Sequence, residues 1–189
     1  MKKKYYSWTD VEVMCQSIVN QMYKDNWTPD YIVGITRGGN TPATIISNII
    51  DVPCEAVKIS LRDGSGGESN LWMSEEAFGY VPETDRAEGP FNSGTVYSDP
   101  SLRKQILIVD DINDTGSTFE WLVDDWKSSC LPDDESWDDI FGHSVRFAVL
   151  TENLSSEFDK VNYFGTEINK AEDDVWICYP WETVGTFNG

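Results

Sequence analysis

The sequence is poor in histidine and in basic residues. It has one histidine, and its 14 lysines and arginines are outnumbered by 33 aspartates and glutamates, which gives a formal net charge of −19. A single histidine, His143, nearly excludes metal sites built from several histidines and argues against a Ser-His-Asp hydrolase. The negative field repels DNA, RNA and anionic membranes, so we expect no nucleic-acid or membrane partner. It also repels phosphorylated substrates unless a cation intervenes.

Paired cysteines and long apolar runs are missing as well. The four cysteines are scattered without a CxxC pair, which favours reduced thiols over a disulfide framework or a zinc site. No run reaches the roughly 18 apolar residues of a membrane span. The basic start "MKKKYYSWTD" is not followed by the apolar region of a secretory signal. We therefore expect a cytoplasmic protein.

The apolar pattern predicts alternating helices and strands. Helical spacing over residues 7–26 is followed by a short strand at 30–35, a helix with Thr41 as N-cap and Pro42 in its first turn, and a strand at 54–60. The second half predicts a strand at 105–110, a helix at 117–129 and strands at 144–151, 162–168 and 174–181. The acidic stretch at 131–139 reads as a solvated loop. This order predicts an α/β fold with a mainly parallel, twisted sheet flanked by helices.

The composition changes between residues 61 and 103, where Gly, Ser, Glu, Asp and Pro dominate. Some 40 residues with little helical pattern are too many for a plain connector. We expect one domain over residues 1–189 that carries an inserted flap or small antiparallel hood at about 61–103. Because few buried-core patterns occur there, we expect this segment to open easily and to act as a lid.

The stretch "QILIVDDINDTGST" (105–118) concentrates unusual chemistry. In an open parallel sheet, ligands sit beyond the carboxyl ends of the strands, where Asp110 and Asp111 follow the apolar run "ILIV". The "DTGST" turn opens a helix and offers main-chain N–H groups and hydroxyls for an anion. The carboxylates suit sugar hydroxyls and hydrated Mg²⁺, and the turn suits a phosphate. As an alternative, single aspartates here act as caps and turn formers.

This stretch resembles the signature of type I phosphoribosyltransferases, which bind 5-phosphoribosyl-1-diphosphate (PRPP). "YIVGITRGGNTPATIISNI" resembles the diphosphate-binding segment of the bacterial xanthine–guanine and hypoxanthine enzymes, and "VKIS" resembles the strand that leads to their flap. "DVWICYPWE" resembles their C-terminal purine-binding segment. The resemblance covers most of the chain outside residues 61–103 and 128–143.

The resemblance implies a set of site residues. Asp110 and Asp111 would hold the ribose hydroxyls, directly or through Mg²⁺, and Asp114 would manage the proton near the purine N7. The 5-phosphate would be wrapped by Thr115, Gly116, Ser117 and Thr118. The diphosphate loop, which in the family contains a non-proline cis peptide, would be Thr36, Arg37 and Gly38. On the base side, Trp176 would stack on the ring and main-chain groups near Ile177 would read its edge. Glu182 matches an acidic position in the family's tail, where we expect a further metal ligand.

Two departures from the family concern the base and the flap. The purine enzymes carry a lysine at the end of the strand that matches "RFAVLT", and it donates to the 6-oxo group; here Glu152 or Asn153 stands in that neighbourhood. A carboxylate at Glu152 would accept hydrogen bonds and would disfavour a 6-oxo group, whereas the Asn153 amide could donate to it. We favour the Asn153 register. The flap also lacks the family's Ser-Tyr pair and is longer.

The sequence thus predicts a Mg²⁺-dependent phosphoribosyltransferase of purine-salvage type that joins a nucleobase to PRPP. We expect a homodimer or homotetramer. Two alternatives stay open: a PRPP-binding regulator without catalysis, and an enzyme of the same fold that acts on a non-purine acceptor.

Overall fold

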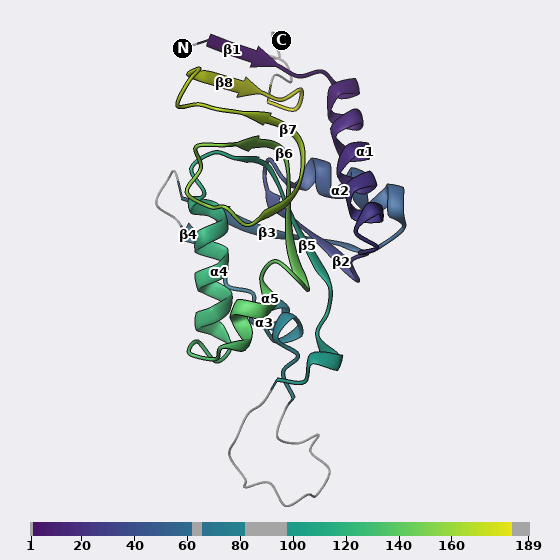
Figure 1. Ribbon diagram of the computed structural model, residues 1–189, viewed down its shortest axis with the longest axis vertical. Coiled ribbons are helices and arrows are strands. Elements are labelled where there is room, and N and C mark those ends of the chain that lie inside the picture. The colour runs from purple at the N-terminus through teal and green to yellow at the C-terminus, as the bar shows by residue number, and fades with distance from the viewer. Residues whose placement is uncertain (1, 62–65, 82–97, 183–189) are drawn as a thin grey trace, which may run out of the picture.

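The computed structural model describes residues 2–61, 66–81 and 98–182, in which a six-stranded sheet lies between two layers of helices (Figure 1). The strand order is β4-β3-β2-β5-β6-β7, and all neighbours are parallel except β3 and β4. The strands are β2 (Tyr31–Thr36), β3 (Cys54–Ser60), β4 (Gly66–Gly67), β5 (Ile106–Asn113), β6 (Val145–Asn153) and β7 (Val161–Ile168). The predicted α/β fold with a mainly parallel sheet is confirmed.

Helices cover both faces of the sheet, which explains the apolar central strands. On one face lie α1 (Trp8–Lys24) and α2 (Asn40–Ile50), and on the other lie α3 (Leu71–Phe78), α4 (Ser117–Ser129) and α5 (Ser136–Ile140) (Figure 1). Side chains alternate along a strand, so Leu107 and Val109 of β5 join the core beside α1 and α2. Ile106 and Ile108 join the core on the other face. A strand buried on both faces reads as a continuous apolar run.

The helix starts illustrate how local chemistry sets the element boundaries. Helix α1 begins with a capping box, in which Ser7 Oγ accepts from Asp10 N at 3.2 Å and Asp10 Oδ2 accepts from Ser7 N at 2.7 Å. Helix α2 begins at Asn40 with Gly39 as N-cap, so the predicted N-cap Thr41 is wrong. Three residues separate the end of β2 from the start of α2, and the last of them, Gly39, lies against Val109 and Asp110 of β5.

Two strands run further than predicted. Strand β5 continues through Asp110 and Asp111 to Asn113, because β6 continues beside it and pairs Ile112 with Thr151. The two aspartates therefore lie within the last half of the strand and not just beyond it. Strand β6 likewise includes Glu152 and Asn153.

The acidic stretch at 131–139 is not a plain solvated loop. Helix α5 starts within it, and Trp137 is 1% exposed while Ile140 is fully buried. The Trp137 indole donates to the Cys130 carbonyl oxygen at 2.9 Å. Because acidic residues surround Trp137 in the sequence, the segment was taken for a solvated loop.

Part of the inserted segment belongs to the core, against the expectation of few buried positions. Helix α3 buries Met73, Ala77 and Phe78 with the same apolar cluster as α4 and α5, and Phe78 contacts Trp137 with ring centroids 5.3 Å apart. A 3-10 turn, Pro100–Leu102, leads back towards β5. The expectation of a mobile lid then concerns residues 62–65 and 82–97, which lie outside the described residues.

A second, two-stranded sheet lies at one end of the molecule (Figure 1). It pairs β1 (Lys2–Tyr5) in parallel with β8 (Val175–Cys178). Strand β1 was not predicted, because "KKKY" has no alternation of apolar and polar residues; all four residues are exposed. All four cysteines are free thiols, as predicted, and His143 is exposed. Within the described ranges, no helix has the length and apolarity needed to cross a membrane.

Candidate active site

The strand order changes direction between β2 and β5, which marks the site. From β2 the chain passes through α2 to β3 on one side, and from β5 it passes through α4 to β6 on the other side. Such a switch point leaves a crevice beyond the carboxyl ends of the two central strands. The turn at residues 36–39 follows β2, and Asp110 and Asp111 lie near the end of β5, so the fold brings these predicted site segments together.

The turn at residues 36–39 lies directly against the two aspartates. A Cβ atom added at Gly38 would be 2.0 Å from Asp111 Oδ2, and one at Gly39 would be 2.2 Å from the Val109 carbonyl oxygen. Glycine is therefore needed at both positions for the close approach of two chain segments. The Thr36–Arg37 peptide is cis, and the Arg37 side chain is exposed. The Thr36 hydroxyl donates to the Val57 carbonyl oxygen of β3 at 3.2 Å, which anchors the start of the turn.

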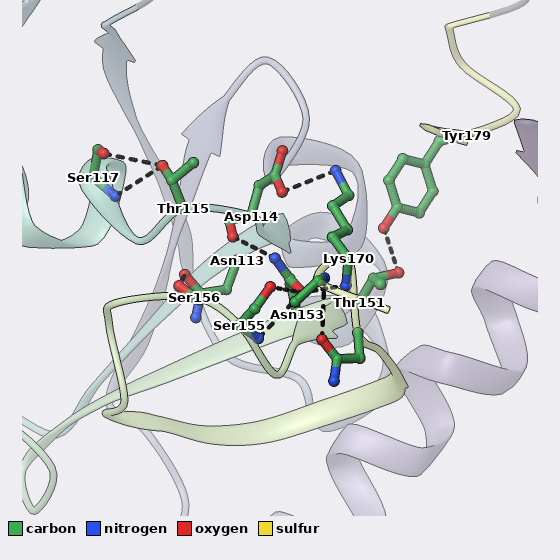
Figure 2. Close-up of polar contacts among 12 residues, drawn as sticks. Asn113, Asp114, Thr115, Ser117, Thr151, Asn153, Ser155, Ser156, Lys170 and Tyr179 are labelled. Carbon is green, nitrogen blue, oxygen red and sulfur yellow. Dashed lines mark hydrogen bonds and ion pairs between the residues drawn. The ribbon is translucent and has the colours of Figure 1, made fainter. Parts of the chain in front are cut away.

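The turn after β5 presents hydroxyls and main-chain N–H groups at the N-terminus of α4. Gly116 is the N-cap residue with a φ of +94°, and a Cβ atom there would meet Phe158 N at 2.6 Å. Thr115 Oγ1 and Ser117 Oγ are 3.0 Å apart, and both residues are exposed (Figure 2). Thr118 follows in the first turn of the helix. The main-chain N–H groups of the first turn and the positive end of the helix dipole favour an anion at this point.

A buried asparagine, Asn113, holds a neighbouring segment against this turn. Asn113 is 2% exposed, and its Nδ2 donates to the Phe158 carbonyl oxygen and to Glu152 Oε1, both at 2.9 Å. Its Oδ1 accepts from Ser156 Oγ at 2.9 Å. The segment that carries Ser156 and Phe158 is thereby held against Gly116. Asn113 was not predicted as a site residue, although an amide inside an acidic motif is the signal that could have indicated it.

Glu152 faces this buried network. Burial is the main cause that raises the pKa of its carboxyl group to about 7; the hydrogen bond from Asn113 opposes this shift, and the charge of Glu167 adds to it. Its Oε2 atom is buried and has no hydrogen-bond partner among the described residues. Successive side chains of a strand point to opposite faces, so Glu152 lies on the opposite side of β6 from Thr151 and Asn153.

Asn153 is engaged with the main chain on the other side of β6. It is 3% exposed, and its Nδ2 donates to the Asp114 carbonyl oxygen at 2.7 Å. Its Oδ1 accepts from Lys170 N at 3.0 Å and from Ser155 Oγ at 2.9 Å. The side chain that meets the Asp114 carboxylate is that of Lys170, whose Nζ lies 2.8 Å from Asp114 Oδ1 (Figure 2). Sequence inspection missed Lys170, a lysine in the otherwise acidic connection between β7 and β8.

The C-terminal segment after β8 packs on the side of β6 that carries Thr151 and Asn153. Trp176 of β8 is 37% exposed, while the next residue, Ile177, is 6% exposed, so their side chains lie on opposite faces of the small sheet. Tyr179 is 1% exposed, and its ring stacks on Trp181 with a centroid distance of 4.8 Å and an interplanar angle of 2°. Burial raises the pKa of the Tyr179 hydroxyl well above its usual value. Of these aromatic side chains, Tyr179 lies beside the carboxylate pair, since its hydroxyl is 2.7 Å from the Asp111 carbonyl oxygen.

The carboxylates fit a magnesium ion that brings other ligands with it. Among the described residues, no group of three or more His, Cys, Asp or Glu side chains is placed to hold a metal, so exposed Glu182 is not brought together with Asp110 and Asp111. Mg²⁺ commonly uses one or two carboxylates and takes its remaining ligands from water and substrate phosphates. Asp110 and Asp111 supply two such carboxylates, and the remaining ligands of the ion would come from water and from the substrate.

Comparisons with known proteins agree with this geometry. Residues 2–181 match the model of the phosphoribosyl transferase domain. The chain is 23% identical over 197 residues to xanthine phosphoribosyltransferase 1 of Saccharomyces cerevisiae, covering 96% of this chain and 90% of that protein. It is 26% identical over 192 residues to the hypoxanthine-guanine phosphoribosyltransferase of Schizosaccharomyces pombe, covering 94% and 88%. A crystal structure of a purine phosphoribosyltransferase from Pyrococcus horikoshii shares the fold, with a TM-score of 0.59, 22% identity and coverage of 100% and 99%.

Proposed function

Because the chain belongs to the phosphoribosyltransferase family, as its sequence predicted, we propose that it transfers the 5-phosphoribosyl group of PRPP to a purine base. Diphosphate is the second product, and Mg²⁺ accompanies PRPP. The observation that carries this proposal is the close approach of Gly38 to Asp111 at the switch point, because the turn at residues 36–39 and the carboxylate pair could then contact one ligand. The names of the relatives, which act on xanthine, hypoxanthine and guanine, support a purine as acceptor.

Each part of PRPP has a matching part of the site. The turn of Thr115, Gly116, Ser117 and Thr118 at the start of α4 would hold the 5-phosphate. The main chain of residues 36–39 would hold the diphosphate, and the exposed Arg37 side chain would supply a fixed cation beside its oxygens. Asp110 and Asp111, between these two turns, would bind the ribose hydroxyls.

The residues also account for the chemistry of transfer. Departure of diphosphate leaves positive charge on the ribose ring, and the Asp110 and Asp111 carboxylates stabilise that charge electrostatically. When bound with PRPP, Mg²⁺ neutralises charge on the leaving group, which matters in a protein of net charge −19. Asp114 would accept the N–H proton that the base loses as the new N–C bond forms. Trp176 would stack on the base, and the main chain of Ile177 would contact its edge.

One assay tests this proposal against both alternatives. The protein is mixed with PRPP, Mg²⁺ and a panel of purine and pyrimidine bases, and diphosphate release is followed with and without EDTA. We expect release with a purine and none with EDTA. If calorimetry shows PRPP binding but no base causes release, the protein is a PRPP-binding regulator. Release with a non-purine acceptor alone would overturn the purine assignment.

The quaternary structure is a separate part of the proposal. We expect a homodimer or homotetramer, and the exposed apolar side chains of Val13 and Tyr23 on α1 are consistent with a face that associates. Sedimentation equilibrium measures the mass directly. A monomer at assay concentration would overturn this part without affecting the catalytic assignment.

A further inference from the structure

Asn113 is a buried amide beside the turn that we assign to the 5-phosphate. It is the last residue of β5 and is only 2% exposed. Both N–H groups of its amide are used, one by the Phe158 carbonyl oxygen and one by Glu152 Oε1, each at 2.9 Å. Its Oδ1 accepts from Ser156 Oγ at 2.9 Å (Figure 2). A buried polar group whose donors are all satisfied specifies one arrangement of its neighbours.

Two of these partners belong to residues 155–158, a short segment after β6 that we call the supporting segment. The Phe158 ring anchors it in the core, with ring centroids 5.2 Å from Phe119. One main-chain hydrogen bond joins it directly to the turn after β5, from Glu157 N to the Thr115 carbonyl oxygen at 3.2 Å. The supporting segment is therefore fixed to the core at one side and to the turn at the other.

The supporting segment packs against Gly116 without any space between them. A Cβ atom added at Gly116 would lie 2.6 Å from Phe158 N and 3.1 Å from Ser156 Oγ. Gly116 is the N-cap residue of α4, so the main-chain N–H groups that begin the helix follow directly after it. The position of those N–H groups therefore depends on the supporting segment, and the position of the segment depends on Asn113.

The fold alone does not require an amide at this position. A buried amide must be desolvated, and apolar groups of the same shape in place of a hydrogen-bonded set can be nearly neutral for stability. A binding site has a stricter requirement, because its groups must be held within about 0.5 Å of the productive geometry. Directional hydrogen bonds from one rigid amide meet that requirement better than apolar packing does. Since both donors of Asn113 are used within the protein, Asn113 acts through its partners.

We propose that Asn113 is a positioning residue for the 5-phosphate of PRPP: its amide holds the supporting segment against Gly116, and this contact fixes the N–H groups that receive the phosphate. The inference rests on the proposed function. Glu152 orients the amide, because its Oε1 and the Phe158 carbonyl oxygen both accept and so keep the amide nitrogen on their side. The amide oxygen is then left for the Ser156 hydroxyl.

The other phosphate end of PRPP is held by different contacts. The turn at residues 36–39 is anchored by the Thr36 hydroxyl, which donates to the Val57 carbonyl oxygen at 3.2 Å, and by the close approach of Gly38 to Asp111. Asn113 therefore acts on the 5-phosphate and not on the diphosphate. This difference between two groups of one substrate separates a positioning role from a general loss of structure.

The test compares Asn113→Leu with Asn162→Leu. Both changes keep the approximate size of the side chain and remove hydrogen bonds from an asparagine that joins main-chain groups. Asn162 accepts from Phe147 N at 3.0 Å and donates to the Gly142 carbonyl oxygen at 3.4 Å, near the start of β6 and β7 and so at the opposite edge of the sheet from the site. Urea unfolding measures stability, and calorimetry measures the affinities for PRPP with Mg²⁺, for ribose 5-phosphate and for diphosphate with Mg²⁺.

Both variants should be less stable than wild type, but only Asn113→Leu should show a selective loss of affinity. We expect it to lose about tenfold or more for PRPP and for ribose 5-phosphate, which corresponds to about 1.4 kcal/mol, with diphosphate affinity within about twofold of wild type. In the transfer assay the KM for PRPP should rise while kcat at saturating PRPP changes much less. Ser156→Ala, which removes one hydrogen bond of the same set, should lose about threefold for the same two ligands.

The outcomes separate this inference from the proposed function. Equal losses for ribose 5-phosphate and diphosphate would mean that Asn113 only stabilises the fold, and would overturn the positioning role. Affinities that all stay within twofold of wild type would overturn it as well. If Asn113→Leu does not fold, Ser156→Ala decides, and the absence of a selective loss in that variant overturns the role. Wild-type protein that binds PRPP but transfers to no purine would instead defeat the proposed function and leave the positioning role intact.

Discussion

The hydroxyl of Tyr179 lies 2.7 Å from the main-chain carbonyl oxygen of Asp111 and connects the C-terminal segment to the carboxylate pair. It is also 2.7 Å from Thr151 Oγ1. A hydroxyl has a single proton, so Tyr179 donates to the Asp111 carbonyl oxygen and accepts from Thr151. The C-terminal segment and the end of β5 are therefore joined by one partly buried hydrogen bond.

Tyr179→Phe should lower both stability and PRPP affinity. The change leaves the Asp111 carbonyl oxygen and the Thr151 hydroxyl without this partner, which costs on the order of 1–2 kcal/mol. Urea unfolding measures the free energy, and calorimetry measures PRPP binding. Tyr5→Phe is the matched control, because Tyr5 is 62% exposed. If Tyr179→Phe unfolds at the same urea concentration as wild type, this hydrogen bond contributes nothing to the free energy of unfolding.

Asp110→Asn combined with Asp111→Asn should abolish PRPP binding without unfolding the protein. The amides keep the shape of the side chains but remove the charges that hold the ribose hydroxyls and Mg²⁺. Calorimetry with PRPP and Mg²⁺ measures the loss, and circular dichroism reports the fold. The control is Asp124→Asn with Asp125→Asn, an adjacent acidic pair in the middle of α4. Unchanged PRPP affinity in the first double variant would sink the assignment.

Gly38→Ala should weaken PRPP binding through Asp111. The new methyl group would lie 2.0 Å from Asp111 Oδ2, so the carboxylate or the turn must move. We expect about a tenfold loss of PRPP affinity or more, because both groups contact the same ligand. In a double-mutant cycle with Asp111→Asn the two losses should not add, since the second change removes the group that the first displaces. Strictly additive losses would show that Gly38 acts independently of Asp111.

Glu152→Gln should stabilise the protein at alkaline pH. The pKa of the Glu152 carboxyl group in the folded protein, about 7, lies above its ordinary value of 4.5. The folded state therefore holds the proton more tightly, and the free energy of unfolding falls as pH rises from about 4.5 to 7. Above pH 7 the full penalty is present, on the order of 1–2 kcal/mol after allowance for partial exposure. The Gln variant lacks this penalty.

The measurement is urea unfolding of wild type and Glu152→Gln at pH 5 and pH 8. The stability advantage of the variant should be larger at pH 8. Glu157→Gln, a change at an exposed glutamate, should give the same difference from wild type at both pH values. An advantage for Glu152→Gln that is constant with pH would mean that the carboxyl group does not titrate in this range.

The PRPP side of the site could be predicted because its residues are close in sequence. Strand β5, the turn at Gly116 and helix α4 follow one another, and their apolar runs and small residues indicate them directly. One long-range contact was also required to predict this side, the pairing of β2 with β5, and a parallel sheet makes that pairing expected. The family resemblance correctly indicated the cis peptide at Thr36–Arg37.

The base side could not be predicted in the same way. The contact of Lys170 with Asp114 joins two connections that no periodicity relates, and Asn153 is an ordinary polar residue until its two main-chain partners are known. Strand β1 is exposed and unpatterned, so its pairing with β8 has no local cause. Helix α3 was missed because Met73, Ala77 and Phe78 carry its apolar face within a stretch rich in Gly and Ser.

The pairing of β1 with β8 has a consequence for synthesis on the ribosome. Chains emerge from the N-terminus and begin to fold before they are complete. The elements that we assign to PRPP, from β2 to the start of α4, have all emerged when Thr118 leaves the ribosome. Strand β1 can pair only after β8 has been synthesised, and Asp114 can form its ion pair only after Lys170 has been synthesised. A nascent chain therefore acquires the residues proposed for the sugar phosphate well before it acquires those proposed for the acceptor.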